Sequence, residues 1–338
     1  MHETLKTAVE QLLIQIHLTD QQSHQCISAI MDGECDPVDI AAFLTAMAAK
    51  GPVSVELVGA AMAMRERATR IVTVRKPLLD TCGTGGDCLH TFNISTATAI
   101  LAAACGVAVA KHGNRSVSSS SGSADVLETM GVNIAIDAAA AGRCLDEIGI
   151  AFCFAPLIHG AMKYAAPVRR QLGFPTIFNL LGPLTNPAGA EFQLLGTNSV
   201  ARAFLMANAL AKLQCRHAFV VCGNNELDEV SLWGVSTVLE VHHGLVHEHR
   251  WTPESFGLPE CDVATLKVKS AAESAEMIRV AFRNSSSPAG AMVIANAAAA
   301  LLAAERVDSL RDGVAKAQHA IDSGLAMGKL NELIAWRP

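Results

Sequence analysis

The chain has 338 residues, of which 51% are hydrophobic, 17% charged and 4% aromatic, and its formal net charge is −6. This length is enough for one large domain or two ordinary domains, and the high apolar content excludes intrinsic disorder. The negative charge, and the absence of any Lys/Arg run longer than two residues, disfavour a nucleic-acid-binding protein.

The sequence also indicates where the protein works. Its longest weakly polar stretch, residues 97–110, is shorter than the roughly 20 apolar residues that a membrane span needs. No basic segment followed by an apolar one opens the chain, so we expect no signal peptide. The ten cysteines form no C-x-x-C pair. We therefore expect a soluble, cytoplasmic protein with reduced thiols and no membrane partner.

The first seventy residues are expected to be helical. Apolar residues recur at spacings of three and four from Leu5 to Ile16. Thr19-Asp20, Asp36-Pro37 and Ser54 offer caps for further helices. No alternation typical of strands occurs here, so an all-helical N-terminal part is predicted.

The pattern changes near Pro77, where short apolar runs begin to alternate with helical segments. We predict strands at residues 78–80, 107–110, 151–154, 219–221 and 237–241. Helices are predicted at 93–104 and 122–130, after Asp137, and over most of 271–336. This alternation indicates an α/β fold with a mainly parallel central sheet flanked by helices.

A glycine-rich loop, Gly83-Thr84-Gly85-Gly86-Asp87, follows the first predicted strand. Ligands of open α/β sheets bind at the carboxyl ends of strands, and glycines let backbone N–H groups approach an anion. The following helix start adds positive potential. The loop is neither a P-loop nor Gly-x-Gly-x-x-Gly. A tight turn with a helix cap is the alternative, and anion binding is favoured over it.

The second predicted strand leads into another unusual loop, residues 111–123. It carries Lys111, Arg115 and many hydroxyl groups, a combination that suits several phosphate oxygens at once. A solvated serine-rich linker is the alternative. It is less favoured because a strand and a helix flank the loop closely.

Two adjacent carboxylates, Asp228 and Glu229, follow the strand predicted at 219–221. Mg²⁺ prefers oxygen ligands and is usually shared with substrate phosphates. In isolation such a pair is more often a solvated surface feature. Beside two anion-binding loops, it supplies the expected cation site.

Three segments, Asp80–Asp87, Lys111–Ser119 and Gly182–Pro187, resemble the anthranilate phosphoribosyltransferase family of tryptophan biosynthesis. Residues 154–156, 169–173 and 176–179 also match, and the order and spacing fit over nearly the whole chain. The resemblance implies Mg²⁺-dependent transfer of a 5-phosphoribosyl group from phosphoribosyl pyrophosphate (PRPP) to the amine of anthranilate. The products are N-(5-phosphoribosyl)anthranilate and pyrophosphate.

The same resemblance implies two domains with the active site between them. A small helical domain would comprise residues 1–72 and a returning segment around 162–190. A larger α/β phosphoribosyl-binding domain would comprise residues 73–161 and 191–338. A hinge would join the two, and the helical domain would form most of a homodimer interface.

Site residues are implied by their positions in the matching motifs. The residues implied for PRPP are Gly83, Gly86, Asp87, Thr91, Asn93, Ile94, Ser95, Thr96, Lys111, His112, Gly113, Asn114, Arg115, Ser116, Val117, Ser118, Ser119 and Ser123. Those implied for anthranilate are Gly83, His112, Asn114, Pro156, His159 and Arg169, with Arg169 meeting the carboxylate. Those implied for Mg²⁺ are Ser95, Asp228 and Glu229.

The chemistry of the reaction is consistent with this set. Pyrophosphate departure needs charge neutralisation, and an uncharged amine needs mainly alignment. No covalent nucleophile is therefore expected. His112 acts either as a general base or as an orienting group, and the sequence is equally consistent with both.

Several positions depart from the family pattern, among them Asn225, which replaces a carboxylate, and residues 270–273, which lack an expected glycine-rich turn. Glu226 stands where Gly is expected, and Glu tolerates positive φ poorly, so we expect an altered loop and an altered Mg²⁺ affinity. Gly160 stands where Pro is usual, which loosens the backbone near the acceptor pocket.

The histidine-rich run at residues 242–249 suggests a metal site at first sight. Structural metal sites combine specific ligand spacing with a closed ligand set, which this run lacks. We interpret it as a hairpin that turns at Gly244, with exposed histidines.

Two alternative functions remain open. One is a pentosyltransferase of the same fold with another acceptor, a different aromatic amine or phosphate in nucleoside phosphorolysis; Arg169 and the complete run from Lys111 to Asn114 disfavour it. The other is a catalytically silent nucleic-acid-binding relative, which the net charge and the intact glycine loop disfavour.

Overall fold

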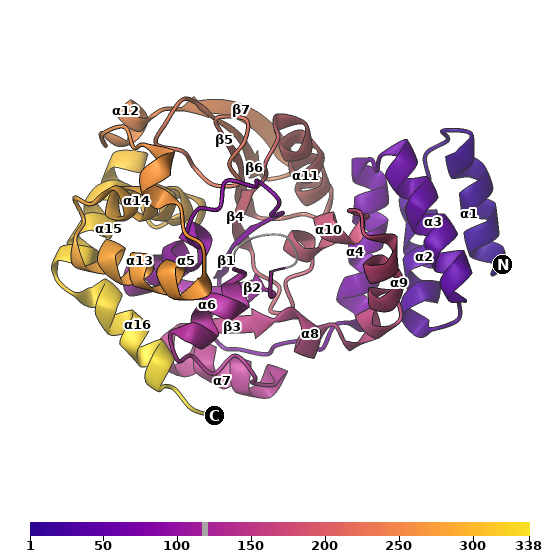
Figure 1. Cartoon of the computed structure of the whole chain (residues 1–338), viewed down its shortest axis with the longest axis horizontal. Coiled ribbons are helices and arrows are strands. Elements are labelled where there is room, and N and C mark those ends of the chain that lie inside the picture. Colours follow the sequence, from indigo (N-terminus) through magenta and orange to yellow (C-terminus); the bar gives the residue numbers. More distant parts are fainter. Residues whose placement is uncertain (117–120) are drawn as a thin grey trace.

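The computed structural model describes residues 1–116 and 121–338 of the chain. Its N-terminal part consists of helices α1 (Glu3–Leu13), α2 (Asp20–Asp32), α3 (Pro37–Lys50) and α4 (Ser54–Arg67), as the sequence predicts (Figure 1). Thr19 caps α2 through a reciprocal capping box with Gln22. Ser54 does not cap α4 as expected. It is the first helical residue, and Glu56 accepts the N–H of Val53 instead.

The rest of the chain surrounds one seven-stranded sheet, with the strand order β3-β2-β1-β4-β5-β6-β7. The strands are β1 (Leu78–Gly83), β2 (Ala108–Gly113), β3 (Ile150–Phe154), β4 (Phe192–Gly196), β5 (His217–Gly223), β6 (Ser236–His242) and β7 (Leu245–Trp251). β1 to β5 pair in parallel, whereas β6 and β7 form an antiparallel edge. The mainly parallel sheet that the sequence predicts is confirmed.

The central strand β4 was not identified from the sequence. Its residues carry no β-branched side chain, and Gln193 interrupts the apolar run, so the strand signal is weak. The structure buries Gln193 and satisfies its amide, which donates to the carbonyl oxygen of Pro183 at 2.6 Å. β4 pairs with β1 on one side and β5 on the other.

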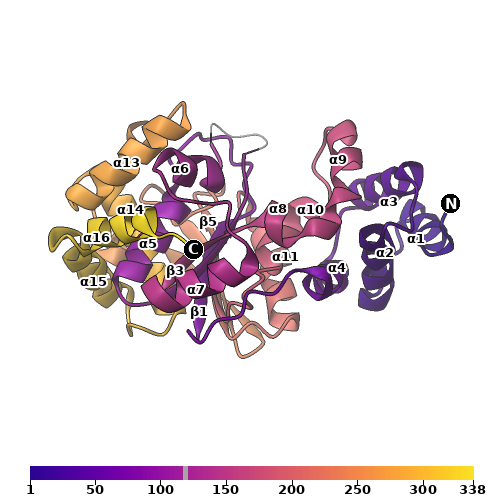
Figure 2. The same ribbon diagram turned by 90° about the horizontal axis from the view of Figure 1, so that it is seen from below.

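Both faces of the sheet are covered, which the alternation along β5 shows directly. Phe219 and Val221 join one hydrophobic cluster, whereas Val220 and Cys222 join a second. Helices α5 (Ile94–Ala104), α7 (Ala138–Ile148) and α14 (Pro288–Ala303) belong to the first cluster, and α11 (Val200–Lys212) belongs to the second. Figure 2 shows α11 on the side of the sheet that faces the N-terminal helices.

The remaining helical elements are short connections or outer-layer helices. They are α6 (Ser123–Thr129), α8 (Ala155–Ile158), η1 (Gly160–Lys163), α9 (Ala166–Leu172), α10 (Phe178–Leu181), η2 (Gly182–Leu184), α12 (Pro253–Phe256), η3 (Val263–Leu266), α13 (Ala271–Arg283), α15 (Leu310–Asp322) and α16 (Leu325–Ala335). Within the described residues, no single helix is long and apolar enough to cross a membrane. Only α13 and α14 reach that threshold together, with a bend of 78° between them.

The chain returns to the N-terminal helices after β3. η1 packs against α2, α9 against α3 and α10 against α4, and Figure 1 shows α9 and α10 beside these helices. Apolar residues of this segment, such as Val168 and Leu181, share a hydrophobic cluster with Phe43 and Leu57. α11 also packs against α4, so the N-terminal helices contact the α/β part directly.

The strand order creates a crevice at one edge of the sheet. After β1 the chain passes through α5 to β2, on one side of the neighbouring strands β1 and β4. After β4 it passes through α11 to β5, on the opposite side of this pair. Adjacent parallel strands whose connections diverge open a binding crevice at their carboxyl ends. The glycine-rich loop after β1 lies at this point.

Candidate active site

A cavity of about 1070 Å³ lies at the carboxyl ends of β1, β2, β4 and β5. Most of the residues expected from the sequence line it: Gly83, Gly86, Asp87, Thr91, Asn93, Ile94, Ser95, Lys111, His112, Gly113, Asn114, Arg115, Ser116, Ser123, Asp228 and Glu229. Val117, Ser118 and Ser119 lie outside the described residues. Residues of the N-terminal helical part, such as Val53, close one side of the cavity.

Four expected residues do not line this cavity. Thr96 is fully buried in the first turn of α5, and Pro156 is exposed on α8. His159 is buried behind His112, with 5.1 Å between the ring centroids. Arg169 lies on α9, and its Nη2 donates to Oδ1 of Asn179, a cavity residue, at 3.4 Å.

The glycine-rich loop wraps around the carboxylate of Asp228. Gly85 and Gly86 adopt φ values of 67° and 80°, which favour glycine. The Gly85 N–H donates to Oδ2 of Asp228 at 2.9 Å. A side chain at Gly83 would place its Cβ 2.5 Å from the same oxygen, so only glycine fits there without displacement.

A second glycine, Gly196 at the end of β4, admits the backbone of the same acidic loop. A Cβ at Gly196 would lie 1.5 Å from the carbonyl oxygen of Asp228. Gly83 and Gly196 are also direct partners in the pairing of β1 with β4. The two facing glycines therefore form the slot that holds Asp228 against the sheet edge.

Three carboxylates converge in this region. Burial raises the pKa of Asp228 to about 7, and repulsion from Asp87 adds to the effect. Burial, followed by repulsion from Asp228, also raises the pKa of Glu229 well above its ordinary value, which Lys111 opposes. Oxygen ligands with excess negative charge fit Mg²⁺, which would relieve this repulsion.

Asn296 on α14 positions the acidic loop, and sequence reasoning missed it. It is fully buried, and its Oδ1 accepts from the Val230 N–H at 2.9 Å. Its Nδ2 donates to the carbonyl oxygens of Val230 and Met292, at 3.1 and 3.0 Å. The residue after Glu229 is thereby tied to a core helix. The only available signal was a single amide in a long alanine-rich helix.

The loop before Asp228 has no positive φ at Glu226, the position where the sequence predicts a conformational conflict. Asn224 and Asn225 take the positive φ values, 47° and 56°, and Glu226 does not. Asn is among the residues that tolerate this conformation best. Glu226 Oε1 instead accepts from Nε1 of Trp233 at 3.0 Å and from Nδ2 of Asn224 at 2.8 Å. The expectation of a conformational conflict at Glu226 was wrong.

Two buried side chains of opposite charge, Lys111 and Asp80, support the second loop. Lys111 donates to the carbonyl oxygen of Thr81 and to Oγ of Ser95, the latter at 3.3 Å. Asp80 accepts from the His112 N–H at 3.1 Å and from Nδ2 of Asn186 at 2.8 Å. Burial lowers the pKa of Lys111 and raises that of Asp80, and their mutual attraction opposes both shifts. Lys111 therefore presents a positive charge at the cavity wall, with Asp80 buried close to it.

His112 is held in one tautomer. Its Nδ1 lies 3.1 Å from the carbonyl oxygen of Gly182, so Nδ1 carries the proton and Nε2 has a free lone pair. Nε2 is buried and has no hydrogen-bond partner among the described residues. Burial lowers the pKa of His112 to about 4 and that of His159 to about 3. Both rings are therefore neutral near pH 7.

The start of α5 and the second loop are linked through Asn93. Its Oδ1 accepts from Oγ of Ser121 at 3.0 Å and from Oγ of Ser274 at 2.8 Å. The Arg115 guanidinium pairs with Asp125 and Glu128 of α6, at 3.0 and 2.8 Å. The charge of Arg115 is thus partly neutralised by α6, the helix that follows the loop.

Comparison with known proteins agrees with this geometry. Residues 75–327 match the model of the glycosyl transferase family, a/b domain, and residues 6–68 match that of its helical bundle domain. The anthranilate phosphoribosyltransferase of Moorella thermoacetica is 46% identical over 332 residues, covering 98% of both chains. The chain belongs to the anthranilate phosphoribosyltransferase family. It is a glycosyltransferase of the pentosyltransferase type, in a family of tryptophan biosynthesis.

Solved structures of this family share the fold over almost their full length. The enzyme from Thermus thermophilus is 40% identical with a TM-score of 0.90, and the match covers 97% of this chain and 98% of that one. The enzyme from Saccharomyces cerevisiae, in complex with PRPP and Mg, is 26% identical with a TM-score of 0.90, covering 99% and 98%. The fold that the sequence resemblance implies is therefore confirmed.

Asn198 and Arg202 also line the cavity, and sequence reasoning did not identify them. Arg202 Nη1 donates to Oδ1 of Asn198 at 2.7 Å, and Nδ2 of Asn198 donates to the Gly86 carbonyl oxygen at 2.6 Å. Both residues follow β4. Because that strand was not predicted, the loop after it was not recognised as part of the site.

Proposed function

We propose that the chain catalyses Mg²⁺-dependent transfer of the 5-phosphoribosyl group of PRPP to the amine of anthranilate, in the cytoplasm. The observation that carries this proposal is the meeting of three carboxylates, a buried lysine and the start of α5 in one cavity. The name that its relatives share, and the PRPP and Mg bound by the Saccharomyces cerevisiae relative, support it.

The donor would lie across the glycine-rich loop, the start of α5 and the second loop. Positive potential from the α5 N-terminus and the charge of Lys111 would stabilise the departing pyrophosphate. Ser95, Asp228 and Glu229 would hold Mg²⁺, which supplies further neutralisation of the phosphate oxygens. The C1–O bond to pyrophosphate breaks as the bond between C1 and the amine nitrogen forms, and the amine then releases its proton to solvent.

The acceptor would lie beside Gly83, His112 and Asn114, the expected anthranilate residues that line the cavity. A pKa of about 4 makes His112 a weak base, so we assign it an orienting role in which Nε2 accepts an amine N–H. Arg169 would meet the carboxylate. It lies on α9, which packs against α3, so movement of the helical part would bring it toward the cavity.

The direct test is a coupled measurement of substrate and metal dependence. Protein, PRPP and anthranilate are mixed with Mg²⁺, and the loss of anthranilate fluorescence is followed. We expect turnover that EDTA abolishes and that Asp228→Asn reduces strongly, with the exposed Asp308→Asn as the matched control. Absence of fluorescence loss at high protein concentration, or full turnover in excess EDTA, would contradict the proposal.

We also propose the domain division that the resemblance implies, with residues 1–72 and 162–190 moving as one unit against 73–161 and 191–338. The packing of η1, α9 and α10 on the N-terminal helices supports it. The exposed apolar side chains of Leu13, Ile14 and Val38 support a homodimer through this unit. Light scattering should give twice the chain mass, and Ile14→Glu should reduce it; a monomeric wild type would refute the dimer.

The fine specificity for the acceptor stays a prediction. Gly160, at the start of η1, has open space around it, and its φ is not positive. The structure should therefore accommodate Gly160→Pro. This variant tests whether the proline that is usual at this position changes the ratio of kcat/KM between anthranilate and its ring-substituted analogues.

A further inference from the structure

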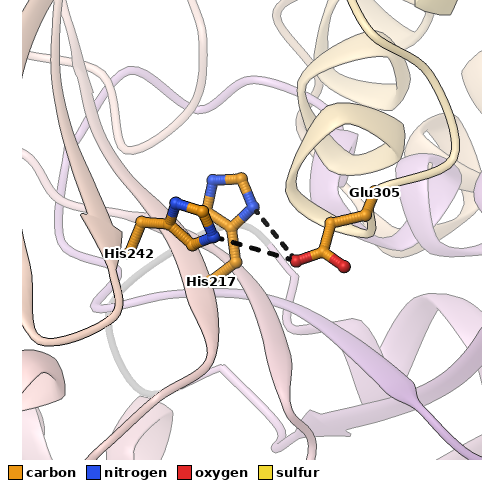
Figure 3. Close-up of side chains that lie close together, drawn as sticks. All are labelled: His217, His242 and Glu305. Atoms are coloured by element: carbon orange, nitrogen blue, oxygen red, sulfur yellow. Dashed lines mark ion pairs between the residues drawn. The ribbon is translucent and has the colours of Figure 1, made fainter.

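His217, His242 and Glu305 form a compact cluster (Figure 3). It lies at the start of β5, whereas the cavity lies at the carboxyl ends of the parallel strands. His217 begins β5 and His242 ends β6, and the antiparallel register pairs these two residues directly. Glu305 follows the end of α14. One ligand atom from each side chain lies within 4.8 Å of the others. The cluster thus joins three segments that are far apart in the sequence.

His217 is already held as a metal-binding imidazole would be. Its Nε2 lies 3.0 Å from Oε1 of Glu240, so this nitrogen carries the ring proton and donates a hydrogen bond to the carboxylate. Its Nδ1 then presents a lone pair toward Glu305 Oε1, at 4.0 Å. Nδ1 is buried and has no hydrogen-bond partner in the part of the chain that the structure describes. A carboxylate behind a ligating histidine is the usual support of a bound metal ion.

We infer that His217, His242 and Glu305 bind a divalent transition-metal ion of the zinc class. Two imidazoles and one carboxylate suit Zn²⁺ and not Mg²⁺, which prefers oxygen ligands. His242 Nε2 faces the same Glu305 oxygen, also at 4.0 Å. His242 and Glu305 are 39% and 36% exposed, so a water molecule has access to the fourth position.

The ligand distances require only a small contraction. Zinc–ligand bonds of about 2.0–2.1 Å in a tetrahedron separate the ligand atoms by about 3.3 Å. Each observed 4.0 Å distance would shorten by roughly 0.7 Å, and the distance between the two imidazole nitrogens, which is at most 4.8 Å, by no more than about 1.5 Å, within the reach of the two partly exposed side chains. Both can adjust by side-chain rotation, whereas His217 is fixed by Glu240 and by the sheet.

The charged groups around the cluster leave this site available. Arg216 pairs with Oε2 of Glu305, the oxygen that does not face the imidazoles. His249 binds Oε2 of Glu240 at 2.8 Å, and the ring of His243 packs on His242 with 4.2 Å between centroids. A metal-free network of ion pairs around Arg216 is the alternative, and the experiment below distinguishes the two.

The ion would have a structural role. β5 runs from His217 to Gly223, the cavity end of the strand, over about 20 Å at roughly 3.3 Å per residue. The site therefore lies too far from the acidic loop to take part in the reaction. It would instead fasten the end of α14 to the antiparallel edge of the sheet.

In the test, Zn²⁺ is titrated into the full chain while saturating Mg²⁺ occupies the acidic loop of the cavity. Binding is measured by calorimetry, and the melting temperature is recorded with and without Zn²⁺. We expect one high-affinity Zn²⁺ per chain and a raised melting temperature. His242→Ala and Glu305→Gln should abolish both effects. Glu240→Gln should weaken binding about 10- to 100-fold, because it removes the support of His217. Co²⁺ in place of Zn²⁺ should give the visible absorption of a tetrahedral site.

Two further variants make the result decisive. His319→Ala removes an exposed histidine on α15 and should bind Zn²⁺ as the wild type does. Arg216→Gln removes the competing ion pair and should retain binding. All variants keep the ten cysteines, so zinc held by thiols would persist in His242→Ala and Glu305→Gln and would overturn the inference. No binding by the wild type, or loss of binding in Arg216→Gln, would overturn it as well.

Discussion

The slot formed by Gly83 and Gly196 gives the sharpest prediction, the effect of Gly196→Ala. The added Cβ would lie 1.5 Å from the Asp228 carbonyl oxygen, whereas ordinary van der Waals contact begins at 3.4 Å. The contact is to backbone, which no side-chain rotation can relieve. The acidic loop therefore has to retreat by roughly 2 Å, because carbon and oxygen atoms cannot overlap.

The expected loss of activity follows from this displacement of the acidic loop. A misplacement of about 1 Å in a reacting group can cost about 100-fold in rate. We expect Gly196→Ala to lower kcat/KM at least about 100-fold, equivalent to about 2.7 kcal/mol of transition-state stabilisation. The loss should be accompanied by a higher Mg²⁺ concentration for half-maximal activity, since Asp228 and Glu229 move together with the loop.

The assay measures kcat/KM for PRPP across a Mg²⁺ series, alongside the melting temperature. Gly328→Ala is the matched control, because Gly328 lies in α16 with open space around it and a φ that is not positive. The control should keep its activity and gain slightly in stability, as Gly→Ala in a helix usually does. If Gly196→Ala retained the wild-type kcat/KM and Mg²⁺ dependence, the close approach of Asp228 to β4 would be refuted.

Three further predictions follow from the same structure. Arg169→Ala should raise the KM for anthranilate far more than that for PRPP, and equal effects on both would argue against an acceptor role. Asn296→Ala should destabilise the fold by about 1–3 kcal/mol, because the buried groups of Val230 lose their partners; its apparent Mg²⁺ affinity should also fall, and denaturant unfolding with a Mg²⁺ titration checks both effects. The low pKa values of His112 and His159 mean that the fold favours their neutral forms, so this contribution to stability is complete above about pH 6.5 and declines as the pH falls toward 4. Asp228 and Glu229, whose pKa values are raised, act in the opposite direction in both proteins, so the readout is the difference in unfolding free energy between the wild type and His159→Phe, measured in urea between pH 7 and 4. This difference should shift in favour of His159→Phe as the pH falls, and a constant difference would contradict the burial argument.

Several features of the site could be predicted because they depend on short stretches of sequence. The glycines after β1, the cations and hydroxyl groups after β2, and the carboxylate pair Asp228-Glu229 each occupy one loop. Such loops follow strands whose carboxyl ends meet at one edge of the sheet. The cavity brings the three loops together as the order of strands implies.

The errors arose where local signals were weak or misleading. β4 has little strand propensity of its own, and pairing with β1 and β5 on both sides stabilises it. At Glu226 the motif suggested strain, but the backbone placed positive φ at the two preceding asparagines instead. A single-residue shift within a loop depends on what the loop packs against, which the motif does not contain.

The sequence by itself determined the fold class, the helical N-terminal part and the loops that carry the chemistry, because periodicity, caps and glycine-rich turns are local properties. Only the tertiary structure decided how closely Asp228 approaches Gly196, why Asn296 is buried in α14, and that His217 meets His242 and Glu305. Those relations join segments that are distant in the chain. They depend on strand register and close packing, so they exist only once the sheet and its helices have assembled.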